Sequence, residues 1–538
     1  MPNILGVSCF FHDSAASLVN EHGVLAAAEE ERFSRKKHDN GFPIHAINFC
    51  LDFGNLNIND LDAIVFYENP VIKFDRVFSR ILKNFPKSLK VLPPLLRSWH
   101  EDKFWFKEIF CKHYKVDRNK IFFENHHTSH AASSFFSSPF SNSATMTIDG
   151  VGEWTTCEFG KYISNNLIKI NEINFPHSLG ILYSAFTEFL GFEVNEGEFK
   201  VMGLASYGKP KYLDKIEKLF ISRNDNSFEL DLDYFSFEHS LNTNLSKKFI
   251  NLFGEKRKIE SQFLKREQSH CLEAELMSEQ KIYADIASSL QHFMNDQVLS
   301  MAKHVKRESK NNFLSYAGGV AYNGVVNQNL IDKSGFEEIF IQPAAGDNGA
   351  SLGAAQSYLF KNFSIEKKNF KFNTSYLGKN YSSQDCLEKI NNYSFDYKEY
   401  NNDEIADIVG DNLFKKKIIG YFDGRFEFGP RALGNRSIIA DPRTIEMKNL
   451  INRSVKFREL FRPFAPIVLD VKAAEYFEIE DSKINQAPYK YMLSVVKVRD
   501  KFVNELQAIT HIDQTARVQI LKKEDNVRMY NIIKKFGE

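Results

Sequence analysis

Residues 144–160 of the chain, ATMTIDGVGEWTTCEFG, contain a β-prone run that ends in an acid, a turn with two glycines and a second β-prone run. Short β-prone runs around a glycine turn are typical of a β-hairpin. A third run covers residues 167–175, and the same order of three runs occurs near the N-terminus, at residues 3–9, 15–20 and 24–30. Helical segments follow each set, so the sequence predicts two related α/β lobes that face one cleft.

Other segments complete this pattern. Further strands are expected at residues 61–67, 313–317 and 339–343, and helices at residues 43–53, 281–306 and 349–359. The strongest helix signal lies in residues 281–306, where apolar residues recur at close to i, i+4 spacing. Its members are Ile282, Ile286, Leu290, Phe293, Met294, Met301 and Val305. The spacing predicts a helix that packs against the core.

Length and composition narrow the function classes. The chain has 538 residues, which suggests about three structural units, and its 69 basic and 69 acidic residues give no net charge. A neutral chain argues against a dedicated nucleic-acid coat or an anionic-membrane binder. No apolar run is long enough to span a membrane, and the N-terminus does not resemble a signal peptide. Six scattered cysteines without a CxxC pair indicate reduced thiols, so we expect a cytoplasmic protein.

The chain divides into segments of different character. Residues 1–362 contain the two predicted lobes, interrupted by a polar, charge-rich insertion at about residues 209–270. Residues 363–403 are rich in Asn, Lys, Ser and Tyr and are expected to form a boundary. A further α/β segment, residues 404–538, begins its first strand near residue 418.

The clearest candidate for chemistry is the segment NHHTSH at residues 125–130. His126 and His130 are four positions apart, so on a helix they share one face and can offer two imidazole nitrogens to one metal ion. A zinc protease of the HExxH type has Glu after the first histidine, whereas this chain has His127 there. The pattern therefore favours a metal site other than a metalloprotease, with ordinary core or surface histidines as the alternative.

Acids and glycines at strand ends extend this candidate site. Asp149 ends the strand quoted above, and Asp347 lies in PAAGDNG, residues 343–349. Each could complete a metal site or be a turn residue. Gly150, and Gly318 with Gly319 after the strand 313–317, could bring backbone N–H groups to a phosphate. Neither loop has the P-loop or GxGxxG pattern.

Arginines dominate the C-terminal part. The segments DGRFEFGPRALGNRS, KFRELFRPF and HIDQTARVQ occupy residues 423–437, 456–464 and 511–519. Guanidinium groups bind phosphate and carboxylate oxygens through two parallel hydrogen bonds. The pattern favours an anion-binding surface, with a set of surface salt bridges as the alternative.

Taken together, these segments resemble the bacterial O-carbamoyltransferases of the nodulation-protein, cephamycin and tobramycin type, over nearly the whole chain. The matching motifs are FHDSAA (11–16), EEERFSRKKH (29–38), HHTSHAASSF (126–135), DGVGEW (149–154), SLGILYSAFTEFLGF (178–192), GEFKVMGLASYG (197–208), AGGVAYN (317–323), GDNGASLGAA (346–355), GRFEFGPRALGNRSI (424–438), FRPFAPIVL (461–469) and THIDQTARVQ (510–519). So many ordered matches are far more specific than any single motif.

The resemblance implies two catalytic modules. The first is an actin-like module with two ribonuclease-H-like lobes, as in the tRNA threonylcarbamoyl transferases. The second is an α/β module of the YrdC type. In such enzymes the second module converts carbamoyl phosphate and ATP, with magnesium, to carbamoyl-AMP, and the first transfers the carbamoyl group to a hydroxyl of a small acceptor.

The resemblance also assigns residues. It implies that His126, His130, Asp149 and Asp347 hold iron(II) or another divalent metal. Nucleotide and phosphates are expected at Gly150, Gly318, Gly319, Asn323, Arg431, Lys456, Arg462 and Arg517. His12, Lys37 and Asp149 are expected to be catalytic. His12 and Lys37 would lie on the acceptor side, with His12 as candidate general base.

The chain departs from the family in two places. Asp513-Gln514-Thr515 stands where the family usually has Asp-Gly-Thr. The family also continues past the position of Glu538, so we expect a shortened second module. The alternatives are a threonylcarbamoyl transferase acting on tRNA, a nucleotide-binding protein without catalysis, and an actin-like sugar kinase.

Overall fold

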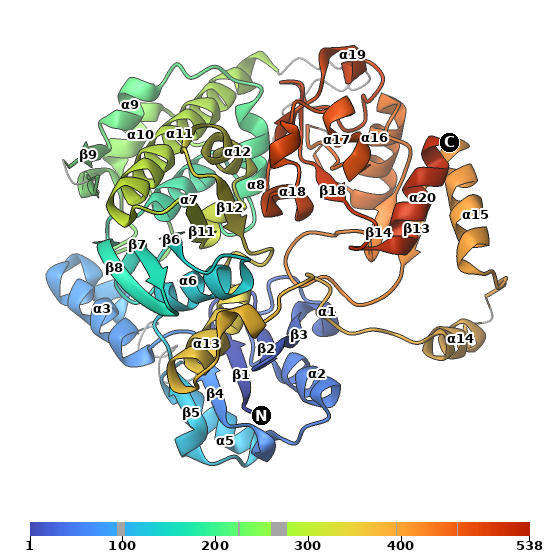
Figure 1. The fold of residues 1–538 in the computed structure, drawn as a ribbon. Coiled ribbons are helices and arrows are strands. Elements are labelled where there is room, and N and C mark those ends of the chain that lie inside the picture. The colour runs from blue at the N-terminus through green and yellow to red at the C-terminus, as the bar shows by residue number, and fades with distance from the viewer. Residues whose placement is uncertain (94–102, 224–225, 260–276, 394, 460) are drawn as a thin grey trace. The chain divides into compact units, whose positions relative to one another are not determined.

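The computed structural model describes residues 1–93, 103–223, 226–259, 277–393, 395–459 and 461–538 (Figure 1). Residues 260–270 of the expected insertion, and Cys271, lie outside this set. The described chain forms two compact units. The first contains the described residues of Met1–Phe263 and Leu276–Phe372, and the second those of Asn373–Glu538.

The first unit has two five-stranded sheets with the same strand order and directions. In each, three antiparallel strands are followed by two parallel strands on the side of the first strand. One sheet has the order β3-β2-β1-β4-β5, from β1 (Asn3–Ser8), β2 (Ala15–Asn20), β3 (Gly23–Glu29), β4 (Ala63–Phe66) and β5 (Ile121–Phe123). The other has the order β8-β7-β6-β11-β12, from β6 (Ser143–Ile148), β7 (Thr155–Ile163), β8 (Asn166–Asn174), β11 (Phe313–Ala317) and β12 (Glu338–Ile341). The prediction of two related α/β lobes is confirmed.

Two helices, α6 (His126–Ser137) and α13 (Asp347–Asn362), pack together beside these sheets (Figure 1). Glycines allow α13 to approach its neighbours. A Cβ on Gly353 would lie 1.7 Å from the Ser129 carbonyl oxygen of α6, and one on Gly6 of β1 would lie 1.8 Å from the Ser351 carbonyl oxygen of α13. The first residues of these helices carry the histidine motif and Asp347, so the packing of α6 on α13 sets the distance between them.

Replacing Gly353 by alanine should therefore separate the two helices. Overpacking of a core usually costs about 1–3 kcal/mol, and we expect the upper end because the obstacle is backbone. Urea unfolding of the whole chain, followed by circular dichroism, measures the loss. Gly537→Ala is the control, since a Cβ there meets nothing within 4 Å. Equal stability of the two variants would contradict this account of the packing.

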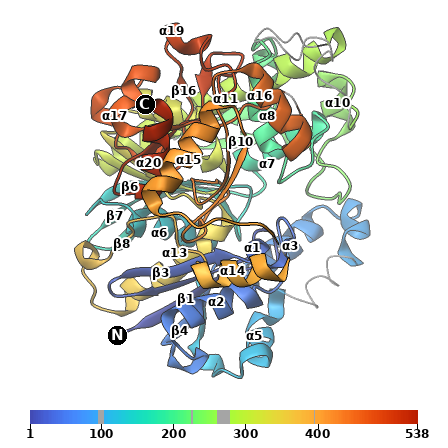
Figure 2. The same cartoon turned by 90° about the vertical axis from the view of Figure 1, so that its right-hand side faces the viewer.

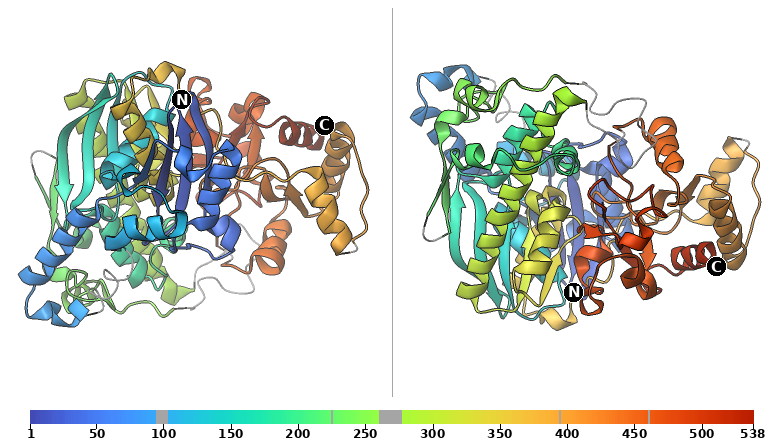
Figure 3. Two further views of the ribbon diagram at one scale, coloured as in Figure 1. Left: turned by 90° about the horizontal axis from the view of Figure 1, so that it is seen from below. Right: turned by 90° about the horizontal axis from the view of Figure 1, so that it is seen from above.

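The other helices of the first unit surround this centre. The longest, α11, packs against β6, β7 and β8 and is the yellow-green helix that crosses the teal strands in Figure 3. The set comprises α1 (Glu31–Ser34), α2 (Ile44–Gly54), α3 (Pro70–Lys83), α5 (Phe106–Tyr114), α7 (Leu179–Phe189), α8 (Glu198–Ala205), α9 (Leu213–Glu217), α10 (Lys247–Phe253), α11 (Lys281–Ser309) and α12 (Gly324–Lys333). The segment of the expected insertion contributes α9, α10 and the hairpin β9 (Phe220–Ser222) and β10 (Phe228–Leu230).

The second unit is built from small sheets and short helices (Figure 2). Its sheets pair β13 (Ile419–Phe422) with β14 (Arg436–Ile439), β15 (Ile467–Leu469) with β18 (Gln519–Leu521), and β16 (Val496–Lys497) with β17 (Thr515–Ala516). Its helices are α14 (Ser383–Asn392), α15 (Asn402–Phe414), α16 (Ile445–Ile451), α17 (Asp470–Tyr476), α18 (Ala487–Lys490), α19 (Asp500–Val503) and α20 (Val527–Gly537). A small core joins α15 to α20 and β14 through Ala406, Leu413, Ile439 and Ile532. The mixed α/β class that the sequence predicted is confirmed in both units.

Some expectations need correction. Ile282, expected on the buried face of α11, is 40% exposed, because the buried face begins with Ala284 and Ile286. The second β-prone run of residues 144–160 forms β7, which begins at Thr155, so Glu153 lies in the turn before this strand. Among the described residues, no helix combines the length and the apolar character needed to cross a membrane.

Candidate metal centre and cation cluster

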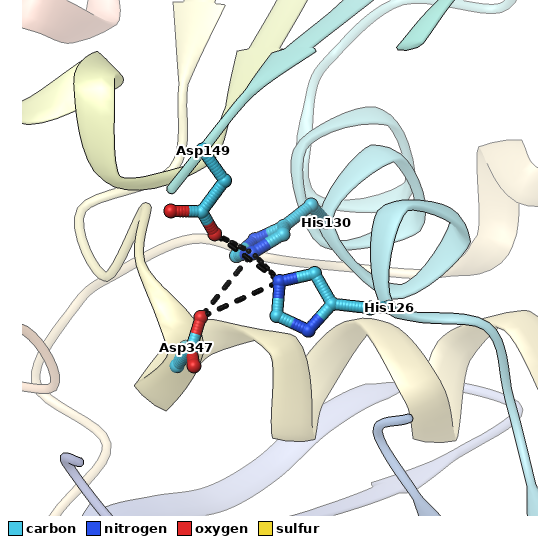
Figure 4. Close-up of side chains that lie close together, drawn as sticks. All are labelled: His126, His130, Asp149 and Asp347. Carbon is cyan, nitrogen blue, oxygen red and sulfur yellow. Dashed lines mark hydrogen bonds and ion pairs between the residues drawn. The ribbon is translucent and has the colours of Figure 1, made fainter. Parts of the chain in front are cut away.

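Four side chains of the first unit converge on one point (Figure 4): His126 and His130 of α6, Asp149 just after β6, and Asp347, the first residue of α13. The Nε2 atoms of the two histidines are 3.1 Å apart, and they lie 3.1 and 2.8 Å from Asp149 Oδ2. Asp347 Oδ1 lies 3.6 and 3.5 Å from the same two nitrogens. The four donor atoms are all within 4.8 Å of one another. The structure thus brings together all the residues predicted as metal ligands.

The electrostatics of this centre attract positive charge. Burial opposes protonation of His130, but its contacts with Asp149 and Asp347 raise its pKa to about 9. Burial likewise opposes ionisation of the two carboxyls, yet the histidines lower the pKa of Asp149 well below its ordinary value and lower that of Asp347. A site that draws a proton to a buried imidazole also favours a metal cation.

The donor set fits a divalent transition metal. Two imidazole nitrogens and two carboxylate oxygens suit iron, zinc or manganese. His126 and His130 are 1% and 0% exposed, which holds their rings in place. The neighbouring His127 is not part of the set, because its Nδ1 contacts Thr147 Oγ1 at 2.6 Å. Burial and the two flanking histidines lower the pKa of His127 well below its ordinary value, so it is neutral.

The predicted phosphate-binding glycines border this centre. The backbone N–H groups of Gly150 and Gly319 donate to Asp149 Oδ1, at 2.7 and 3.3 Å. Gly318 has φ of 96°, and a Cβ there would lie 2.3 Å from the Ile148 carbonyl oxygen, so only glycine fits. Asn323 lies further along this loop, where its side chain caps α12 and pairs with Gln291. The Asn323 side chain therefore has a structural task of its own.

His12 is tied to residues that the sequence did not single out. Its Nδ1 lies 3.0 Å from Asp13 Oδ2, and Asp13 Oδ1 lies 2.7 Å from His38 Nδ1. Burial lowers the pKa of His12, but Asp13, Asp347 and Asp149 together raise it to about 9, which places His12 near the metal ligands. Lys37 is exposed and forms an ion pair with Glu196. The adjacency of His12 and Asp13 in the sequence was the only signal for this pair.

Glu153 is a second residue that sequence reasoning missed. Asn125, which precedes α6, makes no side-chain capping bond. Both carboxylate oxygens of Glu153 instead accept from the backbone N–H of His126, at 3.1 Å each. Negative charge at a helix N-terminus is stabilising, so the turn after Asp149 fixes the start of the histidine helix.

The second unit gathers the predicted arginines and a lysine. Burial, together with the charges of Arg431 and Arg462, lowers the pKa of Arg517 well below its ordinary value. Burial and the charges of Arg462 and Arg517 lower the pKa of Arg458 to about 10. The pKa of Lys456 is lowered by burial and by Arg458 and Arg462. Arg431, Lys456, Arg458, Arg462 and Arg517 thus form one cation cluster, to which sequence reasoning assigned all but Arg458.

A buried acid shapes the loop that carries Arg431. Glu427 is 4% exposed, and its Oε1 accepts from the backbone N–H groups of Leu433, Asn435 and Arg436 at 2.9, 2.9 and 3.2 Å. The loop between them includes Gly429 and Gly434, both with positive φ. The glycines and Glu427 therefore hold Arg431 on a tightly folded turn. A group of like positive charges favours a multivalent anion.

Comparisons with known proteins cover both units. Residues 3–356 match the model of the carbamoyltransferase N-terminus, and residues 410–538 that of the carbamoyltransferase C-terminus. The chain is 39% identical to the uncharacterized protein sll1178 of Synechocystis, with 100% of this chain and 89% of that protein covered. It is 32% identical to the nodulation protein NolNO of Sinorhizobium fredii, with 98% and 72% covered.

Among solved structures, component A of the (R)-2-hydroxyglutaryl-CoA dehydratase of Acidaminococcus fermentans is 12% identical, with a TM-score of 0.37. That alignment covers 67% of this chain and 99% of the other. So distant a likeness says nothing about the activity of this chain. The family models, by contrast, match most of its length, and the chain belongs to the carbamoyltransferase family.

Proposed function

We propose that the chain is an O-carbamoyltransferase that works in two steps, one in each unit. In the first step water cleaves carbamoyl phosphate into carbamate and phosphate, and a carbamate oxygen attacks the α-phosphorus of ATP. Pyrophosphate leaves and carbamoyl-AMP forms. In the second step, an acceptor hydroxyl attacks the carbamoyl carbon, loses its proton and displaces AMP.

The observation that carries this proposal is the convergence of His126, His130, Asp149 and Asp347 in the part of the chain that matches the carbamoyltransferase N-terminus. These residues would hold a divalent metal, iron(II) in the enzymes that the chain resembles. A bound metal of this kind supplies Lewis-acid chemistry to a phosphoryl oxygen, which makes AMP a better leaving group. The glycines Gly150, Gly318 and Gly319 would border the phosphate side. The two related lobes support an actin-like assignment for this unit.

The residues around His12 supply the proton transfer. Because its pKa is raised to about 9, His12 is mostly protonated at neutral pH. If its Nε2 atom is the base that accepts the proton of the acceptor hydroxyl, transfer should therefore increase with pH up to about 9. Burial opposes the charge on Asp13, but His12 and His38 lower its pKa below the ordinary value, so Asp13 stays a carboxylate. Lys37, which is exposed and paired with Glu196, would lie on the acceptor side.

The cation cluster supports the assignment of the first step to the second unit. Arg431, Lys456, Arg462 and Arg517 would bind carbamoyl phosphate and the phosphates of ATP with magnesium. Each of these substrates carries several negative charges. Charge-assisted hydrogen bonds from guanidinium groups are about twice as strong as neutral ones. We place the activating chemistry in this YrdC-like module.

The test is a transfer assay with a labelled carbamoyl group. The purified chain, loaded with iron(II), is incubated with [14C]carbamoyl phosphate, ATP and magnesium, and with a panel of sugars and aminoglycosides that carry free hydroxyls. We expect label in an alkali-sensitive carbamate ester, with one AMP per product. Label in tRNA added to a parallel reaction, or release of ADP with phosphate on the acceptor, would contradict the proposal.

A further inference from the structure

Behind the metal ligands lies a set of buried charges that the proposed reaction does not use. Glu68, Lys73, Arg76 and Glu153, here called the charged quartet, are 0%, 6%, 8% and 6% exposed. Two acids and two bases leave the quartet neutral in total. Buried charges are costly unless they are paired, so their position calls for an explanation.

Glu68, Arg76 and Glu153 each contact His126 or the turn that packs against it, and Lys73 contacts Glu68. Glu68 forms an ion pair with Lys73, and its Oε2 lies 3.8 Å from His126 Nδ1. Glu153 accepts from the His126 backbone N–H, as described above, and from the Asn69 N–H at 2.7 Å. Arg76 donates to the Gly152 carbonyl oxygen at 2.9 Å.

Packing completes the enclosure of the imidazole. A Cβ on Gly152 would lie 3.0 Å from the Cβ and Cδ2 atoms of His126. Because glycine has no side chain, the turn that contains Gly152 can pack directly against the imidazole ring. The ring centroid of Tyr67 is 5.4 Å away. Different residues contact the backbone, the ring face and the Nδ1 atom of His126.

We infer that Glu68, anchored by Lys73, is a positioning residue that fixes His126 for metal binding. The negative charge of Glu68, 3.8 Å from Nδ1, favours the proton on that nitrogen and leaves the lone pair of Nε2 facing Asp149 and Asp347. Metal-bound histidines are commonly oriented by such a carboxylate on the other ring nitrogen. The inference rests on the metal centre of the proposed function.

The experiment measures metal affinity and needs no acceptor. Metal-free full-length chain is titrated with Co2+ against a competing chelator, and the visible absorption of the bound ion is followed. Loss of an outer partner of a metal ligand typically lowers affinity about 10–100-fold, and we expect this for Glu68→Gln. Glu68→Asp, which keeps the charge, should recover part of the affinity.

The matched control is Glu158→Gln. Glu158 is 2% exposed and pairs with Lys169 at 2.6 Å, but it lies outside the quartet. This variant should bind Co2+ as the wild type does, at a comparable thermal stability. Should Glu68→Gln fail to fold, the double variant Glu68→Gln/Lys73→Met removes both ends of the buried pair and should show the same weakening.

The outcomes separate the two claims. Co2+ binding by Glu68→Gln, or by the double variant, that is as tight as in the wild type would overturn the positioning role alone. No binding of Co2+ by the wild type would overturn the metal centre, and the positioning role with it. Weakening in the Glu68 variants, with normal binding in Glu158→Gln, supports the inference.

Discussion

Replacing His130 by alanine is expected to abolish carbamoyl transfer while carbamoyl-AMP still forms. His130 has no exposed surface, and its Nε2 contacts both carboxylates of the metal centre. Loss of an outer partner of a metal ligand already costs about 10–100-fold in metal affinity or activity. Loss of a ligand should therefore cost more than about a hundredfold in transfer. Adenylate formation should persist because the cation cluster belongs to the other unit.

The measurement supplies both steps and separates their products by liquid chromatography. His127→Gln is the control, since His127 lies on the same helix and is equally buried but contacts Thr147. It should keep transfer activity. Normal transfer by His130→Ala would show that the four residues do not form the working centre. Loss of both steps would show that the two reactions depend on the same residues.

Replacing Arg517 by methionine is expected to abolish carbamoyl-AMP formation without lowering stability. Hydrogen bonds to charged groups are worth about 1.5–3 kcal/mol each, so the loss of two bonds to phosphate corresponds to about a hundredfold or more in rate. The depressed pKa of Arg517 shows that its positive charge is disfavoured in the folded state, by burial and by Arg431 and Arg462. Removing that charge should leave the melting temperature unchanged or raise it.

Pyrophosphate release and thermal unfolding of the same samples test both parts. Arg443→Met is the contrasting control. Arg443 forms a salt bridge to the buried Asp441 at 2.7 Å and lies outside the cation cluster. It should lower the melting temperature and keep pyrophosphate release. If Arg517→Met instead melts earlier and still makes carbamoyl-AMP, Arg517 is a structural residue and the cation cluster is not the ATP site.

The sheets and the metal ligands could be predicted because their signals are local. Alternating or continuous apolar runs located β1, β6 and β11, and the i, i+4 spacing placed His126 and His130 on one helical face. Asp149 ends a predicted strand and Asp347 lies in a predicted loop, and each has a glycine next to it. These positions made both residues candidate metal ligands. Because the two sheets have the same strand order, these segments, which are far apart in the sequence, lie at one edge.

The supporting residues could not be predicted, because their roles depend on distant contacts. Glu153 caps a helix whose first residue lies 27 positions earlier, and no local capping pattern reveals such a bond. Glu68 lies two residues after β4, and its place beside His126 depends on how β4 and α6 are arranged in the fold. Asn323 matched a family motif, yet its side chain bonds to Gln291 and to the helix that it caps.

One measurement tests the central claim most directly. The purified chain is incubated with ATP, carbamoyl phosphate and magnesium, without acceptor, and the nucleotides are identified by mass spectrometry. We predict carbamoyl-AMP together with pyrophosphate and phosphate, dependent on carbamoyl phosphate. Formation of ADP, or unchanged ATP in the presence of both substrates, would contradict the assignment of carbamoyl activation to this chain.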